Sequence, residues 1–284
     1  MGIICVERVI VAVRDLAASR EKWRRAGFAV APEEFDRGGI RFARLAAGAV
    51  EIDLCAVRSA ESSSPLAQPL RDATNNDSGG GIVGWVWGVK GVLISDEREP
   101  AAAGASVESV LLPGLATPSV KAEMLSSGLP GVVTAAAPIS LDLESRRQSL
   151  ARLCGTNPNT VEYLEHIFVM TPVLDDTIGA NEAIGVPCKR IREIGDGNGT
   201  RQAFFKLEQT VLEVVGPARR GRPGCWGVAL MCTDIAEAVA TARANELQAT
   251  APKLAIQGGQ IARIVEPLDG VAIAFMQPGP RRDD

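Results

Sequence analysis

The sequence holds one histidine, His166, and one tyrosine in 284 residues, and aromatic side chains make up only 4% of the chain. A site built from two or more histidines is therefore excluded. The chain also lacks a C-x-x-C pair, because its six cysteines are scattered without the spacing typical of zinc ligands. Cysteines of this kind are typical of a reducing compartment, so we expect a cytoplasmic protein.

Positive charge is not in excess either, since 30 basic residues stand against 34 acidic ones and the formal net charge is −4. Proteins that bind nucleic acid present a basic surface, so we expect no such partner and interpret Lys189–Arg192 as a solvated face. No apolar run reaches the length that crosses a bilayer. The first residues lack the basic segment and cleavage site of a signal peptide. We therefore expect no membrane partner.

The first part of the chain predicts a compact unit. The β-branched run Val6–Val13 predicts a strand, and Asp15 predicts the N-cap of a helix that Gly27 ends. Three short strand-like runs follow, at residues 28–30, 40–45 and 49–54. Together they define a βαβββ module.

The same pattern recurs later in the chain. Internal repeats of this kind indicate an architecture built from tandem modules. Val6–Val11 aligns with Leu164–Val169, and Val50–Ile52 aligns with Leu212–Val214. A further module opens with a strand at Trp226. The region between the clear copies predicts a diverged one, with strands at residues 82–89, 107–112, 120–125 and 138–143 and a short helix at 95–104.

We therefore predict an α+β fold of four βαβββ modules in tandem, paired into two half-open mixed-sheet barrels. The N-terminal domain is predicted at residues 1–146, with modules at 1–58 and 80–146. The C-terminal domain is predicted at residues 162–284, with modules at 162–217 and 222–278. Residues 147–161 connect them, as the end of an amphipathic helix at Leu143–Cys154 and the loop after it. Residues 59–81 have the Ser, Asn, Pro and Gly content of a linker.

This pattern resembles the vicinal-oxygen-chelate superfamily, which includes glyoxalase I, extradiol dioxygenases, epimerases and drug-binding resistance proteins. The resemblance is carried by Val6–Val9, by Leu164–Ile167, and by Arg201–Leu207 leading to Leu212–Val215. It implies that metal ligands come from the first and last strands of the modules and face the barrel cavities. The first-strand positions hold Arg8, Trp85, His166 and Gly227, and the last-strand positions hold Glu51, Asp142, Glu213 and Ala274.

These residues depart from the ligand sets of the active members. An extradiol dioxygenase binds iron through two histidines and a carboxylate, so a single histidine argues against that activity. A glyoxalase-type site takes two ligands from each of two paired modules, and here only His166 and Glu213 can serve. One divalent ion (Zn, Ni, Mn or Fe) would have these two ligands and water, unless Gln202, Gln257, Gln260 or a cysteine joins them.

Three interpretations of His166 and Glu213 stay open. They bind a metal ion that acts as a Lewis acid, or they form a hydrogen-bonded buried pair without further function. In the third, Glu213 is a general base tuned by burial, and His166 orients it or transfers a proton.

Other candidates line the predicted cavities. Arg8 and Glu51 are predicted to form an ion pair in the space that a metal would take, because a guanidinium has only donors. Asp142 is expected to join them. These three could also bind an anionic substrate. Trp85 and Trp226 are expected as an apolar wall for a ring-bearing ligand, although core packing explains them as well.

The resemblance favours a small-molecule enzyme of the glyoxalase-like type. Its reaction would be an isomerisation or a lyase reaction next to a carbonyl, through an enolate-like intermediate, with His166 and Glu213 as catalytic residues. Arg8, Glu51, Trp85, Asp142, Gln202 and Trp226 are the expected substrate-binding residues. The alternative is a protein that binds a hydrophobic or aromatic compound without chemistry, and a third option is a scaffold with filled cavities. Edge strands of such modules often pair between chains, which leaves a homodimer open.

Overall fold

The computed structural model describes residues 2–59, 61–62, 64–90, 109–111, 121–125, 132–138, 142–195, 199–217, 223–255 and 258–279. The first half forms an eight-stranded mixed sheet with the order β2-β3-β4-β1-β5-β8-β7-β6. Its strands are β1 (Gly2–Val13), β2 (Phe35–Arg37), β3 (Ile40–Ala47), β4 (Val50–Val57), β5 (Gly80–Lys90), β6 (Ser109–Leu111), β7 (Lys121–Leu125) and β8 (Val133–Pro138).

The second half repeats this arrangement in another eight-stranded sheet, with the order β10-β11-β12-β9-β13-β16-β15-β14. Its strands are β9 (Val161–Met170), β10 (Arg190–Glu193), β11 (Arg201–Leu207), β12 (Thr210–Gly216), β13 (Gly224–Cys232), β14 (Lys253–Leu254), β15 (Gln260–Arg263) and β16 (Ala272–Gln277). In both halves the first strand of one module pairs parallel with the last strand of that module. The fold class predicted from the repeat is therefore confirmed.

Five helices accompany the sheets in the described part of the chain: α1 (Leu16–Arg25), α2 (Ala67–Thr74), α3 (Leu143–Cys154), α4 (Leu174–Ala183) and α5 (Ile235–Ala244). The carboxylates of Asp15 and Asp234 cap α1 and α5 by accepting bonds from backbone N–H groups. The connecting helix was predicted with the bounds that α3 has. None of the helices in the described ranges combines the length and the apolar character that a bilayer span requires.

Three local predictions were wrong. Residues 28–30 make only an isolated bridge from Val30 to Leu45, and the strand at this point is β2 instead. The expected strand at 138–143 is β8, which ends at Pro138. The expected linker contains α2, because Leu66 and Leu70 give this polar stretch an apolar face that packs in the core. The expected helix at 95–104 lies outside the described residues.

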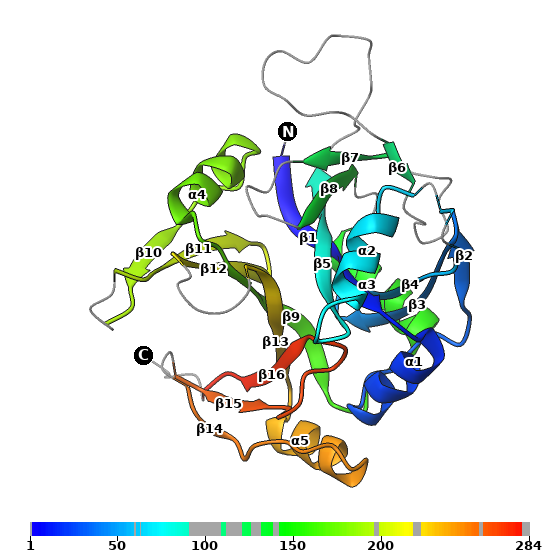
Figure 1. Cartoon of the computed structure of the whole chain (residues 1–284). Coiled ribbons are helices and arrows are strands. Elements are labelled where there is room, and N and C mark those ends of the chain that lie inside the picture. Colours follow the sequence, from blue (N-terminus) through cyan, green and yellow to red (C-terminus); the bar gives the residue numbers. More distant parts are fainter. Residues whose placement is uncertain are drawn as a thin grey trace.

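Each sheet has an inner face, which lines its half-open barrel, and an outer face. Different elements cover the inner faces of the two sheets. On the first sheet, Leu66 and Leu70 at α2 pack against residues of β1, β3 and β5, and Leu150 of α3 packs beside Ala46. On the second sheet, α4 and α5 pack on the opposite, outer face, in the cluster that contains Leu212. Figure 1 shows α2 and α3 against the first sheet and α4 and α5 outside the second. Only the second inner face is therefore free of a helix among the described residues.

Several contacts join the two halves, and two of them show how closely the halves approach. The Trp23 indole Nε1 donates a hydrogen bond of 3.0 Å to Asp269, and Lys22 binds the other carboxylate oxygen at 2.7 Å. On the far side, Gly48 at the β3–β4 turn lies against the backbone of Glu162, where an added Cβ would approach the Glu162 carbonyl oxygen to 2.2 Å. A glycine is required there for this close approach.

Candidate functional site

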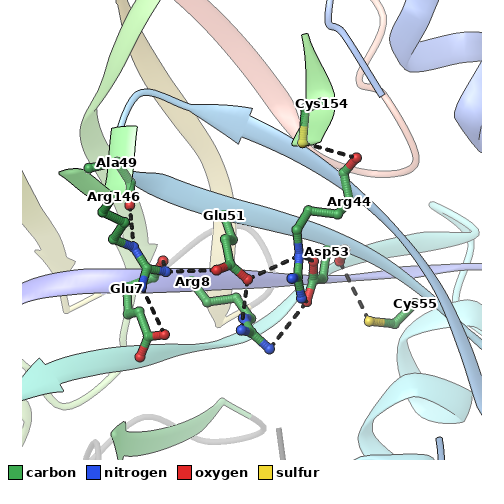
Figure 2. Close-up of polar contacts among 9 residues, drawn as sticks. All are labelled: Glu7, Arg8, Arg44, Ala49, Glu51, Asp53, Cys55, Arg146 and Cys154. Atoms are coloured by element: carbon green, nitrogen blue, oxygen red, sulfur yellow. Dashed lines mark hydrogen bonds and ion pairs between the residues drawn. The ribbon is translucent and has the colours of Figure 1, made fainter. Parts of the chain in front are cut away.

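The inner face of the first sheet holds a buried network of ion pairs (Figure 2). Arg8 lies 2.7 Å from Glu51 and 3.4 Å from Asp53, measured between guanidinium nitrogen and carboxylate oxygen. Arg44 binds Asp53 through two contacts of 2.8 and 3.0 Å and reaches Glu51 at 3.0 Å. The predicted Arg8–Glu51 ion pair is thus confirmed, although Arg8 is shared between two carboxylates.

Helix α3 completes this network. Arg146 lies 2.9 Å from Glu51 and 3.1 Å from Glu7, and it donates to the Ala49 carbonyl at 2.7 Å. Three guanidinium groups thus face three carboxylates, and all six side chains are buried. Filled by these groups and covered by α3, the first inner face is a poor place for a substrate.

The pKa shifts in the network follow from burial and pairing. Burial alone would raise the pKa of Asp53, but the guanidinium groups of Arg44 and Arg8 outweigh it and hold that pKa below its usual range. Burial raises the pKa of Glu7, and Arg146 only partly offsets it. The network therefore keeps Asp53 ionised and leaves Glu7 the more readily protonated of these two acids.

Two residues predicted to line this cavity lie elsewhere. Asp142 is exposed at the N-cap of α3 and accepts a hydrogen bond from the Ser145 backbone at 2.8 Å. Trp85 points to the other face, where it is fully buried in the core, and Val86 is the residue opposite Arg8. The sequence missed this because bulges shift the β1–β5 register, and a shift of one residue moves a side chain to the other face.

The inner face of the second sheet brings His166 and Glu213 together. Strand β12 runs parallel to β9, so that Glu213 lies beside Phe168, two residues from His166. The His166 Nε2 atom is 3.8 Å from a Glu213 carboxylate oxygen, and both residues are buried. The repeat predicts this juxtaposition, while the chemical role of the pair stays a prediction.

A bulge adds a third group that the sequence did not suggest. Leu164 pairs with Leu230 and His166 with Ala229, so Glu165 is the extra residue on β9. Its carboxylate contacts Nδ1 of His166. Strand β1 has the same irregularity at Glu7. The Glu165 carboxylate therefore lies against the Nδ1 side of the imidazole, and Nε2 lies on the side of Glu213.

The environment shifts both titratable groups toward their neutral forms. Burial lowers the pKa of His166 to about 4. Burial also raises the pKa of Glu213, against the opposing effects of Arg192 and of a hydrogen bond from the Gln202 amide at 2.7 Å. At neutral pH the imidazole is therefore uncharged, and Glu213 is a stronger base than a solvated glutamate.

Aromatic rings extend from the pair across the sheet. The Phe168 ring stacks on His166 with centroids 5.5 Å apart and an interplanar angle of 2°. The Trp226 ring also stacks on Phe168, with centroids 5.1 Å apart, and 43% of the Trp226 surface is exposed. Trp226 thus lies where a ring-bearing ligand could reach it.

Two arginines on the edge strand β10 also belong to this face. Arg192 pairs across the strands with Gln202, and Arg190 pairs with Phe204, whose ring lies 4.9 Å from the Arg190 guanidinium. Both were interpreted as a solvated surface. The signal that could have identified them is the Arg-x-Arg spacing, which puts both side chains on one face of a strand.

The donor set does not fit the metal ion that the resemblance implies. The described residues contain no group of three or more His, Cys, Asp or Glu side chains placed to hold an ion. Strands β13 and β16 present Gly227 and Ala274, and the Gln202 amide is a donor to Glu213. Gln260 is exposed on β15, and Gln257 lies outside the described residues. Two ligands are fewer than protein zinc sites use.

Two solved structures resemble the chain over its whole length. A mutant of 4-hydroxymandelate synthase from Streptomyces coelicolor matches with a TM-score of 0.68 and 15% identity, covering 100% of this chain and 95% of that chain. A fusion of a xylose isomerase-like TIM barrel with 4-hydroxyphenylpyruvate dioxygenase matches with a TM-score of 0.64 and 15% identity, covering 100% of this chain and 50% of that chain. No family model and no curated protein sequence matches. Likeness at this identity shows the fold, while function depends on the site.

Proposed function

We propose that this chain, which has the fold of the vicinal-oxygen-chelate superfamily, is a small-molecule enzyme that moves a proton at a carbon next to a carbonyl group. The observation that carries the proposal is Glu213, a buried carboxylate of raised pKa on the helix-free inner face of the second sheet. Carboxylates tuned in this way are effective general bases near neutral pH.

The surrounding groups have distinct tasks in this reaction. One Glu213 oxygen is held by Gln202, which leaves the oxygen on the His166 side to accept the proton from carbon. Neutral His166, which Glu165 contacts at Nδ1, lies beside this oxygen and orients it, and the proton that Glu213 takes from carbon returns from Glu213 to the same carbon. The resulting enolate-like charge is stabilised by the nearby Arg192, because a guanidinium binds anionic oxygen well.

The same residues define the substrate class. Arg190 and Arg192 suit a carboxylate, and Phe168 and Trp226 suit an aromatic or apolar group. A 2-oxo acid with an aryl group on the adjacent carbon combines both features with an exchangeable C–H bond. Phenylpyruvate is therefore the probe that this site recommends.

The test is proton exchange at carbon 3 of phenylpyruvate in D₂O, followed by NMR and corrected for the reaction without protein. We expect the protein to accelerate exchange, Glu213→Gln to abolish the acceleration, and Glu208→Gln, an exposed glutamate at the next turn, to preserve it. Acceleration that survives Glu213→Gln would overturn the assignment of the base. Binding of phenylpyruvate without acceleration would instead support the alternative of a non-catalytic binding protein.

A further inference from the structure

A cleft of about 730 Å³ lies where the two halves meet. Its walls come from α2 and the loop after it, from the first residues of β5 and β8, and from the first residues of β13. This volume is within the range of sites for drug-sized ligands. The cleft shares Trp226 with the catalytic proposal above but not its base, since neither His166 nor Glu213 is among the described residues that line it.

Trp226 indicates which kind of ligand the cleft could bind. The other three tryptophans, Trp23, Trp85 and Trp87, are fully buried, whereas Trp226 is 43% exposed and lines the cleft. A bulge at this point of β13, between Cys225 and Gly227 in the register with β9, places it there. An indole that packs on Phe168 and is also open to a cleft offers stacking surface to a flat ring.

Glycines keep the cleft open beside this ring. Gly81 and Gly224 both line it with φ angles of +143° and +126°, and nothing lies within 4 Å of a Cβ built on either. Their bare peptide groups allow a flat ligand to approach closely. Gly270, from the second half, packs against the Gly80 carbonyl, where a Cβ would approach to 2.6 Å, so the two halves are in contact at the cleft.

The charge of the cleft selects among flat ligands. Asp72, exposed on α2, is the one charged side chain among the described residues that line it. The other polar groups there are neutral, including the Asn75 amide. We propose that this cleft binds a planar aromatic compound without negative charge, stacked on Trp226 and oriented by Asp72.

The experiment uses proflavine, a planar tricyclic cation, and anthracene-2-carboxylate, a planar tricyclic anion, as probes. Calorimetry on the full chain should show one proflavine site that binds at least about tenfold more tightly than the anion. Trp226→Ala should weaken proflavine binding by about tenfold or more. Asp72→Lys should weaken it severalfold, while Asp176→Lys, a matched change at an exposed aspartate on α4, should not.

Glu213→Gln separates this site from the catalytic proposal. We expect that variant to bind proflavine as the unmodified protein does, even if no exchange activity is ever found. Equal affinity for the cation and the anion would overturn the proposal, as would unchanged binding in Trp226→Ala. Loss of proflavine binding in Glu213→Gln would also overturn it, because the probe would then occupy the inner face of the second sheet.

Discussion

His166 Nε2 lies 3.8 Å from the Glu213 carboxylate, while the corresponding residues of the first half, Arg8 and Glu51, are in contact at 2.7 Å. The same two positions of the fold thus carry a closed ion pair in one half and an open acid–imidazole pair in the other. A guanidinium stays charged and neutralises its acid. A neutral imidazole leaves the acid available for a proton, so we place the proposed chemistry in the second half.

The first prediction concerns the titration of His166. Burial should hold its pKa at about 4, against 6.5 for a solvated imidazole. Because His166 is the single histidine of the chain, its ring signals in an NMR titration are unambiguous. We expect one transition near pH 4. A midpoint near 6.5 would show that the ring is solvated and would contradict the buried geometry.

The second prediction concerns the pH dependence of stability that the lowered pKa of His166 implies. Between pH 6.5 and about 4, the unfolded chain binds a proton at His166 that the folded chain does not bind, so the free energy of unfolding falls as pH falls through this window. The loss is at most about 3 kcal/mol. Urea unfolding of the unmodified protein and of His166→Asn should show a shallower pH dependence in the variant. Equal slopes would contradict the prediction.

The third prediction tests the network under α3. Arg146→Ala removes the guanidinium that binds both Glu7 and Glu51, leaving buried acids with fewer partners. We expect a loss of about 3–5 kcal/mol in the free energy of unfolding. Arg147→Ala, next to it but half exposed and 3.8 Å from Glu144, is the control and should change stability by less than about 0.5 kcal/mol. Similar losses in both variants would argue against the network.

Whether the sequence predicted a residue of this site depends on which structural feature determines the position of its side chain. The repeat of βαβββ modules sets the strand order, and the strand order brings Glu213 beside β9. Arg146 was missed because a helix between modules places it, and no periodicity reports where that helix packs. Glu165 was missed, and Trp85 was expected on the wrong face, because single-residue bulges decide which face a side chain takes.

The fourth prediction concerns the joint between the halves. Asp269 accepts bonds from the buried Trp23 indole and from Lys22, and its φ angle is +47°. Asp269→Ala leaves the indole N–H without its acceptor and puts alanine in the left-handed region, so we expect a loss of about 2–3 kcal/mol. Asp269→Asn keeps an acceptor and tolerates that backbone, and should lose less. Thermal unfolding of both variants checks this order of losses. Equal losses in the two variants would indicate an exposed contact and would contradict the prediction.

The fifth prediction tests whether Arg192 acts on the base and on the substrate. Its charge opposes the raised pKa of Glu213, so Arg192→Gln should raise that pKa further. If Glu213 must be ionised to accept a proton, the acid limb of the pH–rate profile for phenylpyruvate exchange moves to higher pH. The loss of a carboxylate partner should also raise KM by about tenfold.

Arg201→Gln is the matched control for Arg192, because Arg201 lies on the neighbouring strand β11 but binds exposed Asp175 at 2.8 Å. It should leave both the acid limb and KM in place. A variant at Arg192 that changes KM alone would make it a substrate-binding residue without influence on Glu213. A variant that changes neither would remove β10 from the site and leave Glu213 tuned by burial and Gln202 alone.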